Sequence, residues 1–411
     1  MDIDQPLPLL AGLTAAQFMR RHWQKKPLLV RGAIANFKPL LSRAELTKLA
    51  GTDAVQSRLI VKSSASWRMK TGPFAPRSLP PISRQGWTLL LQNVDAHNST
   101  IHQLLQQFRF VPDAVLDDLM ISLASTGGGV GPHFDSYDVF LLQASGRREW
   151  KISRQKDLTL KSDMPLKILQ NFVPETTFVL EAGDMLYLPP RYAHDGIALA
   201  AAGAKGQDMV CMTYSIGFKA PLATELGAEV LHKLAEFSED AAEPVQTHTG
   251  LSNKRPSPMR PLHKQARRFR DPAQAATPAP AELPQALIGF ASSAAAQALG
   301  DPLAVACAVG EIMTTPKASL WFEEASSDWA DAAQYGLVLD IKTKMMYGTD
   351  HVFINGESYL AKGADATLMR ALANNRRLSR VELAKASSAA TTLLADWHAA
   401  GWLRVALTLV A

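Results

Sequence analysis

The chain has 411 residues, of which 47% are hydrophobic and 20% charged, and this composition excludes a disordered, collagen-like or disulfide-scaffold protein. At roughly 100–200 residues per domain, the length predicts two to four domains. The net charge of +5 is concentrated in residues 251–270, which hold seven Lys and Arg and no acid, so the rest of the chain is mildly acidic. We expect this basic segment to be a solvated linker, with an electrostatic contact to RNA or a ribosomal surface as the alternative.

The sequence predicts a cytoplasmic protein without a membrane anchor. The first four residues are acidic and lack the basic and apolar regions of a signal peptide. The longest apolar stretch, 286–299, is too short to span a bilayer. Cys211 and Cys307 are too few for a disulfide framework, and a reducing compartment fits them best.

The first third of the chain predicts short helices and strands. We expect a helix leading into a strand at 12–30, a short helix at 44–50, strands at 55–70, a loop at 71–86, a buried strand at 87–94 and an amphipathic helix at 101–110. From residue 116 the pattern becomes rich in strands. These are expected at 118–124, 137–143, 149–153, 177–180, 185–188 and 209–216, a spacing typical of a barrel or sandwich.

The remainder predicts helices and a small mixed unit. Helices are expected at 222–237, 283–299 and 302–313, with a basic, Pro-rich linker at 239–285. A C-terminal unit follows, with strands near 336–347 and 351–361, helices near 365–373, 379–386 and 389–400, and a strand at 402–409. We therefore predict an α+β chain of three domains: 1–218 with the strand-rich barrel or sandwich, 219–315 helical and 316–411 winged-helix-like.

A candidate metal site comes from two separated motifs. His133 and Asp135 are two residues apart, which places them on one face if the segment is a strand. His194 follows a Gly-Asp turn and an apolar strand, at a predicted strand start. Two imidazoles and one carboxylate form the facial triad of non-haem Fe(II). His-x-Asp alone is weak evidence, and a surface loop histidine is the alternative for His194.

A buried arginine is predicted by strand alternation. Arg148 shares a face with Trp150 and Ile152, while its neighbours on the other face are charged. A buried guanidinium is costly unless it is paired, and its fork matches a carboxylate. We therefore expect Arg148 to receive the carboxylate of a ligand such as 2-oxoglutarate. The alternative is a strand-end arginine that reaches solvent.

Residues 127–150 and 183–194 resemble the JmjC-type ribosomal oxygenases of bacteria, which hydroxylate an arginine of a large-subunit ribosomal protein, protein sixteen. The resemblance implies a double-stranded β-helix (a JmjC/cupin jelly-roll barrel), a helical dimerisation region and a winged helix. It implies that His133, Asp135 and His194 hold Fe(II) as the catalytic centre. Arg148 would bind the distal carboxylate of 2-oxoglutarate, with O2 as the other co-substrate. The linker at 239–285 is longer and more basic than the resemblance leads us to expect.

The resemblance also suggests secondary roles. Ser122 would contact the co-substrate and Tyr137 would contact the substrate, with ordinary barrel packing as the alternative for both. Tyr137 and Asp138 would suit a cationic substrate. Asp195 is a candidate for orienting a ligand or capping a turn, and Tyr214 and Ser215 are candidates for lining the site. Cys211, His351 and His398 are expected to be structural or surface residues, and the glycines at 127–129 to allow close backbone approach.

The leading hypothesis is a protein hydroxylase that depends on Fe(II) and 2-oxoglutarate. A JmjC lysyl demethylase or a small-molecule oxygenase is an alternative that the triad cannot separate. Another is a ligand-sensing regulator, but residues 301–411 hold 10 basic and 12 acidic residues, which disfavours direct DNA binding. An apolar stripe on 222–237 predicts a homodimer, with packing within one chain as the alternative.

Overall fold

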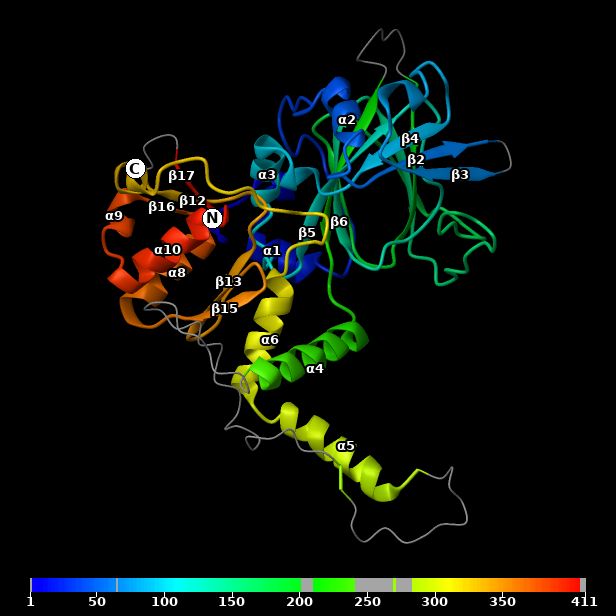
Figure 1. The fold of residues 1–411 in the computed structure, drawn as a ribbon. Coiled ribbons are helices and arrows are strands. Elements are labelled where there is room, and N and C mark those ends of the chain that lie inside the picture. Colours follow the sequence, from blue (N-terminus) through cyan, green and yellow to red (C-terminus); the bar gives the residue numbers. More distant parts are fainter. Residues whose placement is uncertain (1, 64–65, 201–209, 241–268, 271–282, 407–411) are drawn as a thin grey trace. The chain divides into compact units, whose positions relative to one another are not determined.

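The computed structural model describes residues 2–63, 66–200, 210–240, 269–270 and 283–406 (Figure 1). They form two compact units, Met1–Ala220 and Pro221–Ala411. The further division of the second unit at residue 315 stays a prediction. The expected linker at 239–285, with its basic segment 251–270, lies almost entirely outside the described residues. Among the described helices, none is long and apolar enough to cross a membrane.

Side-chain caps define the three helices of the first unit: α1 (Ala15–Arg21), α2 (Arg43–Ala50) and α3 (Ser99–Gln106). Thr14 and Ser42 accept hydrogen bonds from backbone N–H groups in capping boxes, and Asn98 caps α3 in the same way. The predicted helix at 101–110 ends early because residues 107–111 continue as turns that insert Phe108 into the core. Short 3-10 helices lie at Pro8–Leu10, Pro76–Ser78 and Val94–Ala96.

Two antiparallel sheets form the body of the first unit (Figure 1). The larger has eight strands in the order β1-β9-β6-β11-β5-β4-β2-β3, and the smaller has the order β10-β7-β8. The strands are β1 (Leu28–Val30), β2 (Ser57–Lys62), β3 (Trp67–Thr71), β4 (Trp87–Leu91), β5 (Leu116–Ala124), β6 (Asp138–Ser145), β7 (Arg148–Ser153), β8 (Thr176–Leu180), β9 (Met185–Leu188), β10 (Ala193–Ala198) and β11 (Cys211–Phe218). The predicted strands are confirmed within a few residues, except that β4 ends at Leu91 rather than at residue 94.

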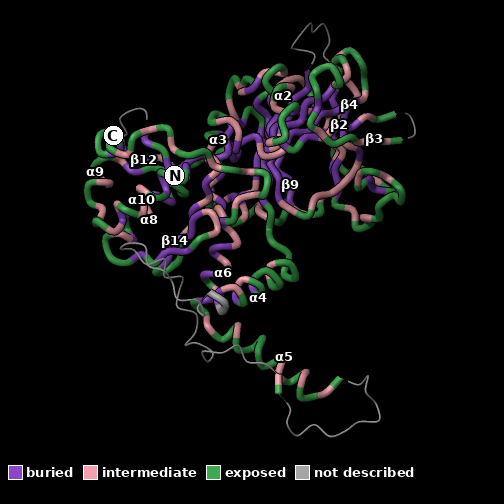
Figure 2. Tube along the Cα trace, viewed as in Figure 1, coloured by how far each residue is buried: buried purple, intermediate pink, exposed green. Residues whose placement is uncertain are grey.

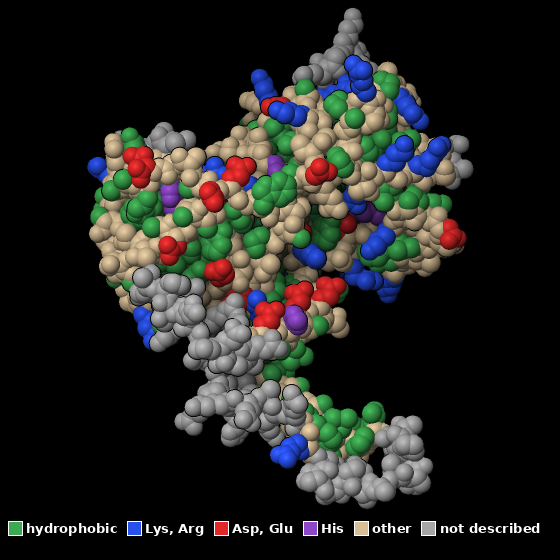
Figure 3. All heavy atoms as spheres, in the orientation of Figure 1, with side chains coloured by type: hydrophobic (Ala, Val, Ile, Leu, Met, Phe, Trp, Pro, Cys, Tyr) green, Lys and Arg blue, Asp and Glu red, His purple; other side chains and the backbone are tan. Residues whose placement is uncertain are grey.

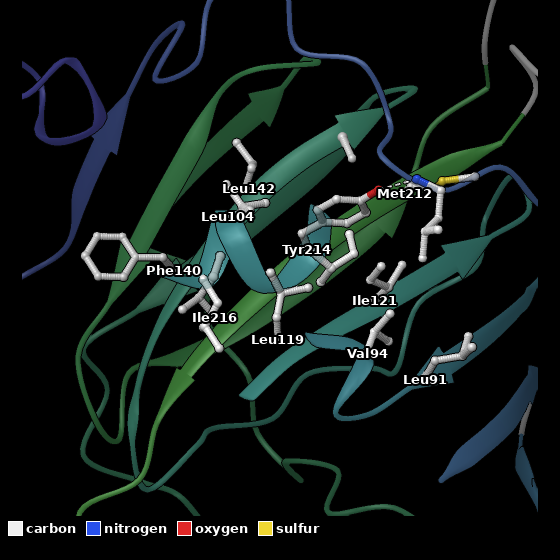
Figure 4. Close-up of a cluster of buried hydrophobic side chains, with 14 of the residues drawn as sticks. Leu91, Val94, Leu104, Leu119, Ile121, Phe140, Leu142, Met212, Tyr214 and Ile216 are labelled. Carbon is white, nitrogen blue, oxygen red and sulfur yellow. Dashed lines mark hydrogen bonds between the residues drawn. The ribbon is translucent and has the colours of Figure 1, made fainter. Parts of the chain in front are cut away.

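Apolar side chains cover both faces of the large sheet. On one face, Phe140, Leu142, Tyr214 and Ile216 join the main core, which the short helices complete (Figure 4). On the other face, side chains of β6 and β9 pack against β7 and β8 of the small sheet; they are Val139, Leu141, Leu186, Leu188, Trp150, Ile152 and Leu180. Alternate residues of β6 therefore serve two different cores, as a period of two requires.

The second unit begins with helices and ends in small sheets. Its elements are α4 (Ala223–Asp240), α5 (Gln285–Ala298), α6 (Pro302–Thr314), the 3-10 helix Trp329–Asp331, α7 (Ala332–Tyr335), β12 (Leu337–Leu339), β13 (Met345–Tyr347), β14 (His351–Ile354), β15 (Glu357–Leu360), α8 (Gly363–Asn375), β16 (Arg377–Leu378), α9 (Arg380–Leu383), α10 (Ser388–Ala399) and β17 (Leu403–Val405). The sheets are β16-β12-β17 and β13-β14-β15. The predicted helices are confirmed, but the strands predicted near 336–347 and 351–361 are each a pair of short ones. The strand predicted at 402–409 is β17, and residues 407–409 of that prediction lie outside the described residues. No residue of α5 is buried (Figure 2).

A buried ion pair joins elements within the second unit. The Glu311 carboxylate on α6 is 1% exposed, accepts a 2.6 Å hydrogen bond from Ser358 and lies 3.3 Å from the Lys233 ammonium of α4. Beside it, Val230, Leu234 and Phe237 of α4 pack on α6. Most of the apolar stripe predicted for a dimer thus packs within the chain, because α6 offers a matching small-residue face.

We predict that Phe140→Ala lowers the free energy of unfolding by about 3–5 kcal/mol, the usual cost of emptying a buried aromatic site. Phe140 is fully buried and contacts the rings of Phe18, Phe108 and Tyr187. Urea denaturation measures the change. Val173→Ala, at a 69% exposed position, is the control and should change the stability by less than about 0.5 kcal/mol. An equal effect of both variants would contradict the assigned core.

Candidate metal centre

Three predicted ligands converge in the first unit. The ligand atoms of His133, Asp135 and His194 all lie within 4.8 Å of one another, and this is the only group of three or more His, Cys, Asp or Glu with that geometry in the described chain. An isolated antiparallel bridge brings the two histidines together. The backbone N–H of His133 donates to His194 at 2.9 Å, and the N–H of His194 donates back at 2.8 Å.

The reasoning that put His133 and Asp135 on a regular strand was wrong. Only His133 is paired, and β6 does not begin until Asp138. Pro132 cannot donate to a ladder, which limits pairing just before His133. Asp135 is held instead by its carbonyl, which accepts a 2.7 Å hydrogen bond from the Arg191 backbone N–H. The ligands converge through this loop geometry and the bridge.

Both imidazoles are oriented in the same way. Nδ1 of His133 lies 2.8 Å from the carbonyl oxygen of Gly131, and Nδ1 of His194 lies 2.9 Å from that of Tyr192. Such a contact fixes the ring and its tautomer and leaves Nε2 for a metal. Nε2 of His194 accordingly faces Asp135, 3.7 Å from Oδ2. Asp195, a candidate for orienting a ligand, holds neither ring, because the backbone carbonyls already do so.

Burial keeps His194 in the form that binds metals. The side chain is 3% exposed, and this burial, together with the nearby His133, lowers the pKa of His194 to about 4. The imidazole is therefore neutral near pH 7, and a metal need not displace a proton from it.

Trp67 and Ile168, which the sequence analysis did not single out, pack against the loop that carries His133. Gly131 has φ +81°, and a Cβ there would lie 2.7 Å from Ile168 and 2.8 Å from the Trp67 ring. A side chain at 131 would thus displace the carbonyl that holds His133. Gly128 and Gly129 are equally confined, since a Cβ would lie 2.3 Å from the Trp87 carbonyl oxygen and 2.4 Å from that of Gly196. The expected close backbone approach is confirmed for these two glycines but not for Gly127, where a Cβ would have no neighbour nearer than 4.0 Å.

Arg148 lies on the inner face, as strand alternation predicts. The residue is 4% exposed, and its guanidinium donates to the Gly196 carbonyl at 3.2 Å and to the Ser122 hydroxyl at 3.5 Å. Its buried Nε has no hydrogen-bond partner in the described structure, and no described carboxylate forms an ion pair with it. The alternative of a side chain reaching solvent is wrong. The Arg148 guanidinium and the Ser122 hydroxyl thus lie side by side on the inner face.

A polar row continues from Ser122 across the large sheet. The Ser122 hydroxyl donates to the Thr213 carbonyl at 3.3 Å, and the Thr213 hydroxyl donates to Gln143 at 2.9 Å. Ser215 lies two residues beyond Thr213 on the same side of β11. Tyr214, however, points into the opposite core and accepts from the Leu40 N–H at 2.9 Å, so its predicted place at the site is wrong. Cys211 is a buried residue beside Ala124 and Ala198.

Acidic groups surround Tyr137. Burial, then the charges of Asp135 and Asp118, raise the pKa of Tyr137. Asp118 lies on the same side of β5 as Ser122, and its Oδ1 would be 3.5 Å from a Cβ at Gly217, which would also lie 3.9 Å from the Tyr137 ring. Asp138 does not contribute to this acidic region, contrary to the prediction. It is buried on the other side and accepts hydrogen bonds from Tyr187 and Gln24.

His351 and His398, the other two histidines considered in the sequence analysis, are buried in the second unit. His351 and His398 of the second unit are 5% and 4% exposed, and His398 lies 3.0 Å from the Ser327 hydroxyl. Burial lowers the pKa of both. Neither belongs to a metal-ligand group among the described residues.

Comparison with known proteins assigns both units. Residues 103–226 match the family description "JmjC domain", and residues 297–404 match "ROXA-like winged helix". The chain carries a JmjC domain and a ROXA-like winged helix. The predicted fold class and the resemblance to the JmjC-type ribosomal oxygenases of bacteria are confirmed.

Two kinds of name recur among the curated relatives: ribosomal oxygenase or ribosomal protein hydroxylase, and bifunctional lysine-specific demethylase and histidyl-hydroxylase. The ribosomal protein uL16 3-hydroxylase of Escherichia coli is 39% identical over 212 residues, 51% of this chain and 53% of the relative. A probable ribosomal oxygenase of Haemophilus influenzae is 31% identical over 221 residues, 52% of each chain. The sequence match thus spans about half the length of these relatives. The solved structure of E. coli ycfD matches 95% of this chain and 98% of its own, with a TM-score of 0.76 and 27% identity. Another, with a TM-score of 0.73, is titled as the ribosomal oxygenase YcfD with cobalt and 2-oxoglutarate.

We predict that His133→Ala weakens Co(II) binding by more than the roughly 10–100-fold that follows loss of an outer-sphere partner. The variant removes one of three converging ligands. Titration calorimetry measures the affinity, and circular dichroism checks the fold. His232→Ala, at an 80% exposed side chain in α4, is the control and should bind Co(II) like the unaltered protein. Unchanged Co(II) affinity in His133→Ala would refute the site.

Proposed function

We propose that this protein is an Fe(II)- and 2-oxoglutarate-dependent oxygenase that hydroxylates an arginine side chain of ribosomal protein uL16. The observation that carries the proposal is the pairing of the His133, Asp135 and His194 group with a buried, carboxylate-free Arg148 on one inner face. Names of the relatives support the substrate and the reaction. The ribosomal substrate also implies a cytoplasmic location.

The residues present fit the metal and the co-substrate. Two imidazoles and one carboxylate are the donor set of non-haem Fe(II) oxygenases and leave positions open. When bound, the iron supplies the oxidative chemistry, in which 2-oxoglutarate and O2 become succinate and CO2 and one oxygen atom enters a substrate C–H bond. His133 and His194 would contribute Nε2, with each ring oriented by a backbone carbonyl, and Asp135, whose main chain is held by Arg191, would contribute a carboxylate oxygen.

Arg148 is suited to hold the distal carboxylate of 2-oxoglutarate. Its guanidinium keeps one buried nitrogen unsatisfied, while Ser122 beside it offers a hydroxyl. A carboxylate placed there would complete the hydrogen bonds of the guanidinium and neutralise its charge. The remaining contacts, to the Gly196 carbonyl and over the Trp150 ring at 5.7 Å, fix the direction of the side chain.

The surroundings of Tyr137 support a cationic substrate. Asp118 and Asp117 act on Tyr137 together with Asp135, so negative charge gathers beside the proposed metal ligands. A guanidinium entering there would meet carboxylates and a phenol. This attraction comes from the acidic side chains near Tyr137 alone. The first unit as a whole holds 25 basic and 18 acidic residues, so its net charge does not attract a cationic substrate.

We also propose a homodimer, but through exposed residues of α4–α6 rather than through the whole predicted stripe on residues 222–237. Val230 and Leu234 of the predicted stripe are buried within the chain, but Leu222 and Leu231 are 59% and 41% exposed. Ile288 of α5 and Leu303 of α6 are also exposed, at 42% and 48%. Exposed apolar side chains on three helices support an interface formed by α4–α6.

Arg148→Ala should raise the 2-oxoglutarate concentration needed for half-maximal turnover by roughly 10–150-fold, since a hydrogen bond to a charged group contributes about 1.5–3 kcal/mol. Succinate release measures this. Arg147→Ala, the exposed neighbour on the other face, should leave the requirement unchanged. Equal 2-oxoglutarate dependence in both variants would exclude Arg148 from the co-substrate site.

Incubation with Fe(II), 2-oxoglutarate and a uL16 peptide should give a product about 16 Da heavier, with the change on an arginine, because one oxygen atom is inserted. Tandem mass spectrometry locates the change, and the peptide with that arginine replaced by lysine is the control. Loss of methyl groups from lysine peptides, or turnover of small molecules alone, would favour the alternative oxygenase classes. Absence of turnover with ligand-dependent DNA binding would favour a regulator.

Light scattering should give twice the chain mass at micromolar concentration. Ile288→Glu with Leu303→Glu should give the monomer mass, because two charges would be buried in the proposed interface. Val381→Glu, at a 61% exposed position, is the control and should remain dimeric. A monomer mass for the unaltered protein would exclude the dimer.

A further inference from the structure

Positive charge in the first unit is concentrated in one ordered stretch. Residues 54–94 contain Arg58, Lys62, Arg68, Lys70, Arg77 and Arg84 and no acidic residue. This stretch is distinct from the basic segment at 251–270. It builds β2, β3 and the loop that leads to β4, at the end of the eight-stranded sheet where β3 is the terminal strand. The charge is therefore carried by defined elements.

Five of these side chains are exposed, and we refer to Lys62, Arg68, Lys70, Arg77 and Arg84 as the basic hairpin surface. Figure 3 shows Lys and Arg side chains gathered on the part of the first unit that carries β2 and β3. None of the five forms an ion pair with a carboxylate of the described residues. Some other exposed or half-buried cations of this unit are paired, as in Arg31 with Asp184 and Arg109 with Asp113.

The hairpin is also fixed beside the candidate metal site. The Trp67 ring packs on Gly131, whose carbonyl holds His133, and the Lys62 ammonium lies 5.3 Å from the centre of that ring. Arg68 and Lys70 are two residues apart on β3, so they point to the same side of the strand, about 6.7 Å apart along it. Trp67 faces Gly131 from the other side of β3, so an anion bound to Arg68 and Lys70 would lie on the exposed face of the hairpin.

We propose that the basic hairpin surface binds the phosphate backbone of RNA. Several unpaired cations without intervening acids match a polyanion, and release of its counterions drives such binding. No large hydrophobic side chain is exposed among the described residues of 54–94, which disfavours a membrane surface. A free, basic ribosomal peptide would be repelled. The inference rests on the proposed function in one respect: the enzyme would engage its ribosomal protein substrate while that protein is associated with RNA.

The test measures RNA binding apart from catalysis. Fluorescence anisotropy of the full chain with a labelled RNA hairpin gives the dissociation constant at several salt concentrations. Arg68→Glu with Lys70→Glu should weaken binding by roughly 10-fold or more and reduce the slope of log affinity against log salt by about 2. Lys26→Glu with Lys38→Glu makes the same change of charge at exposed positions flanking β1, at the opposite end of the sheet, and should retain the affinity.

Other outcomes would overturn the inference. Equal RNA affinity in both double variants, or no RNA binding by the unaltered chain, would do so. So would a loss in the hairpin variant that is confined to acidic lipid vesicles or to acidic peptides. If the Glu double variant fails to fold, Arg68→Gln with Lys70→Gln is used in its place. Hydroxylation of an isolated peptide should persist in the hairpin variants. Absent hydroxylation in the unaltered chain would therefore refute the proposed function while leaving the RNA result to be judged by itself.

Discussion

Two backbone hydrogen bonds between His133 and His194 hold the candidate site together. They join the segment that leads into β6 of the large sheet to the start of β10 in the small sheet. The same two residues carry the imidazoles, so the distance between the ligands is set by main-chain pairing. The third ligand, Asp135, is held by the Arg191 N–H in the same region. A constellation fixed in this way is ready for a ligand without rearrangement of long loops.

The inner face departs from the usual rule that buried charges are paired. Arg148 is buried and has no described carboxylate partner, whereas the equally buried Glu311 of the second unit has both Lys233 and Ser358. An unpaired buried charge destabilises a fold, and such local violations are expected where function requires them. The contrast distinguishes a structural ion pair from a charge that is suited to a ligand.

The sequence predicts the strands well because they are short apolar or alternating runs separated by Gly, Pro and Asp, and the alternation on β7 places Arg148 inward. It predicts the loop of His133 less well, since an isolated bridge leaves no periodic pattern. The wrong placements of Asp138 and Tyr214 share one cause: both faces of the large sheet are buried, so a polar side chain can be satisfied on either side. The contacts of Trp67 and Ile168 with Gly131 depend on distant segments and have no local pattern. The stripe on α4 predicts burial correctly, but not the identity of the partner surface.

Charge balance explains why the proposed metal and co-substrate belong together. Near pH 7 His194 contributes no charge, and Asp135 and Arg148 carry opposite charges on the inner face. A divalent cation alone would add two positive charges to a region of low dielectric, and a dianion alone would add two negative ones. Each addition is costly by itself. The charges of the two cancel when both are bound, and Arg148 would face the distal carboxylate of the dianion. The neutral form of His194 is part of this balance, because a protonated imidazole would leave one positive charge in excess.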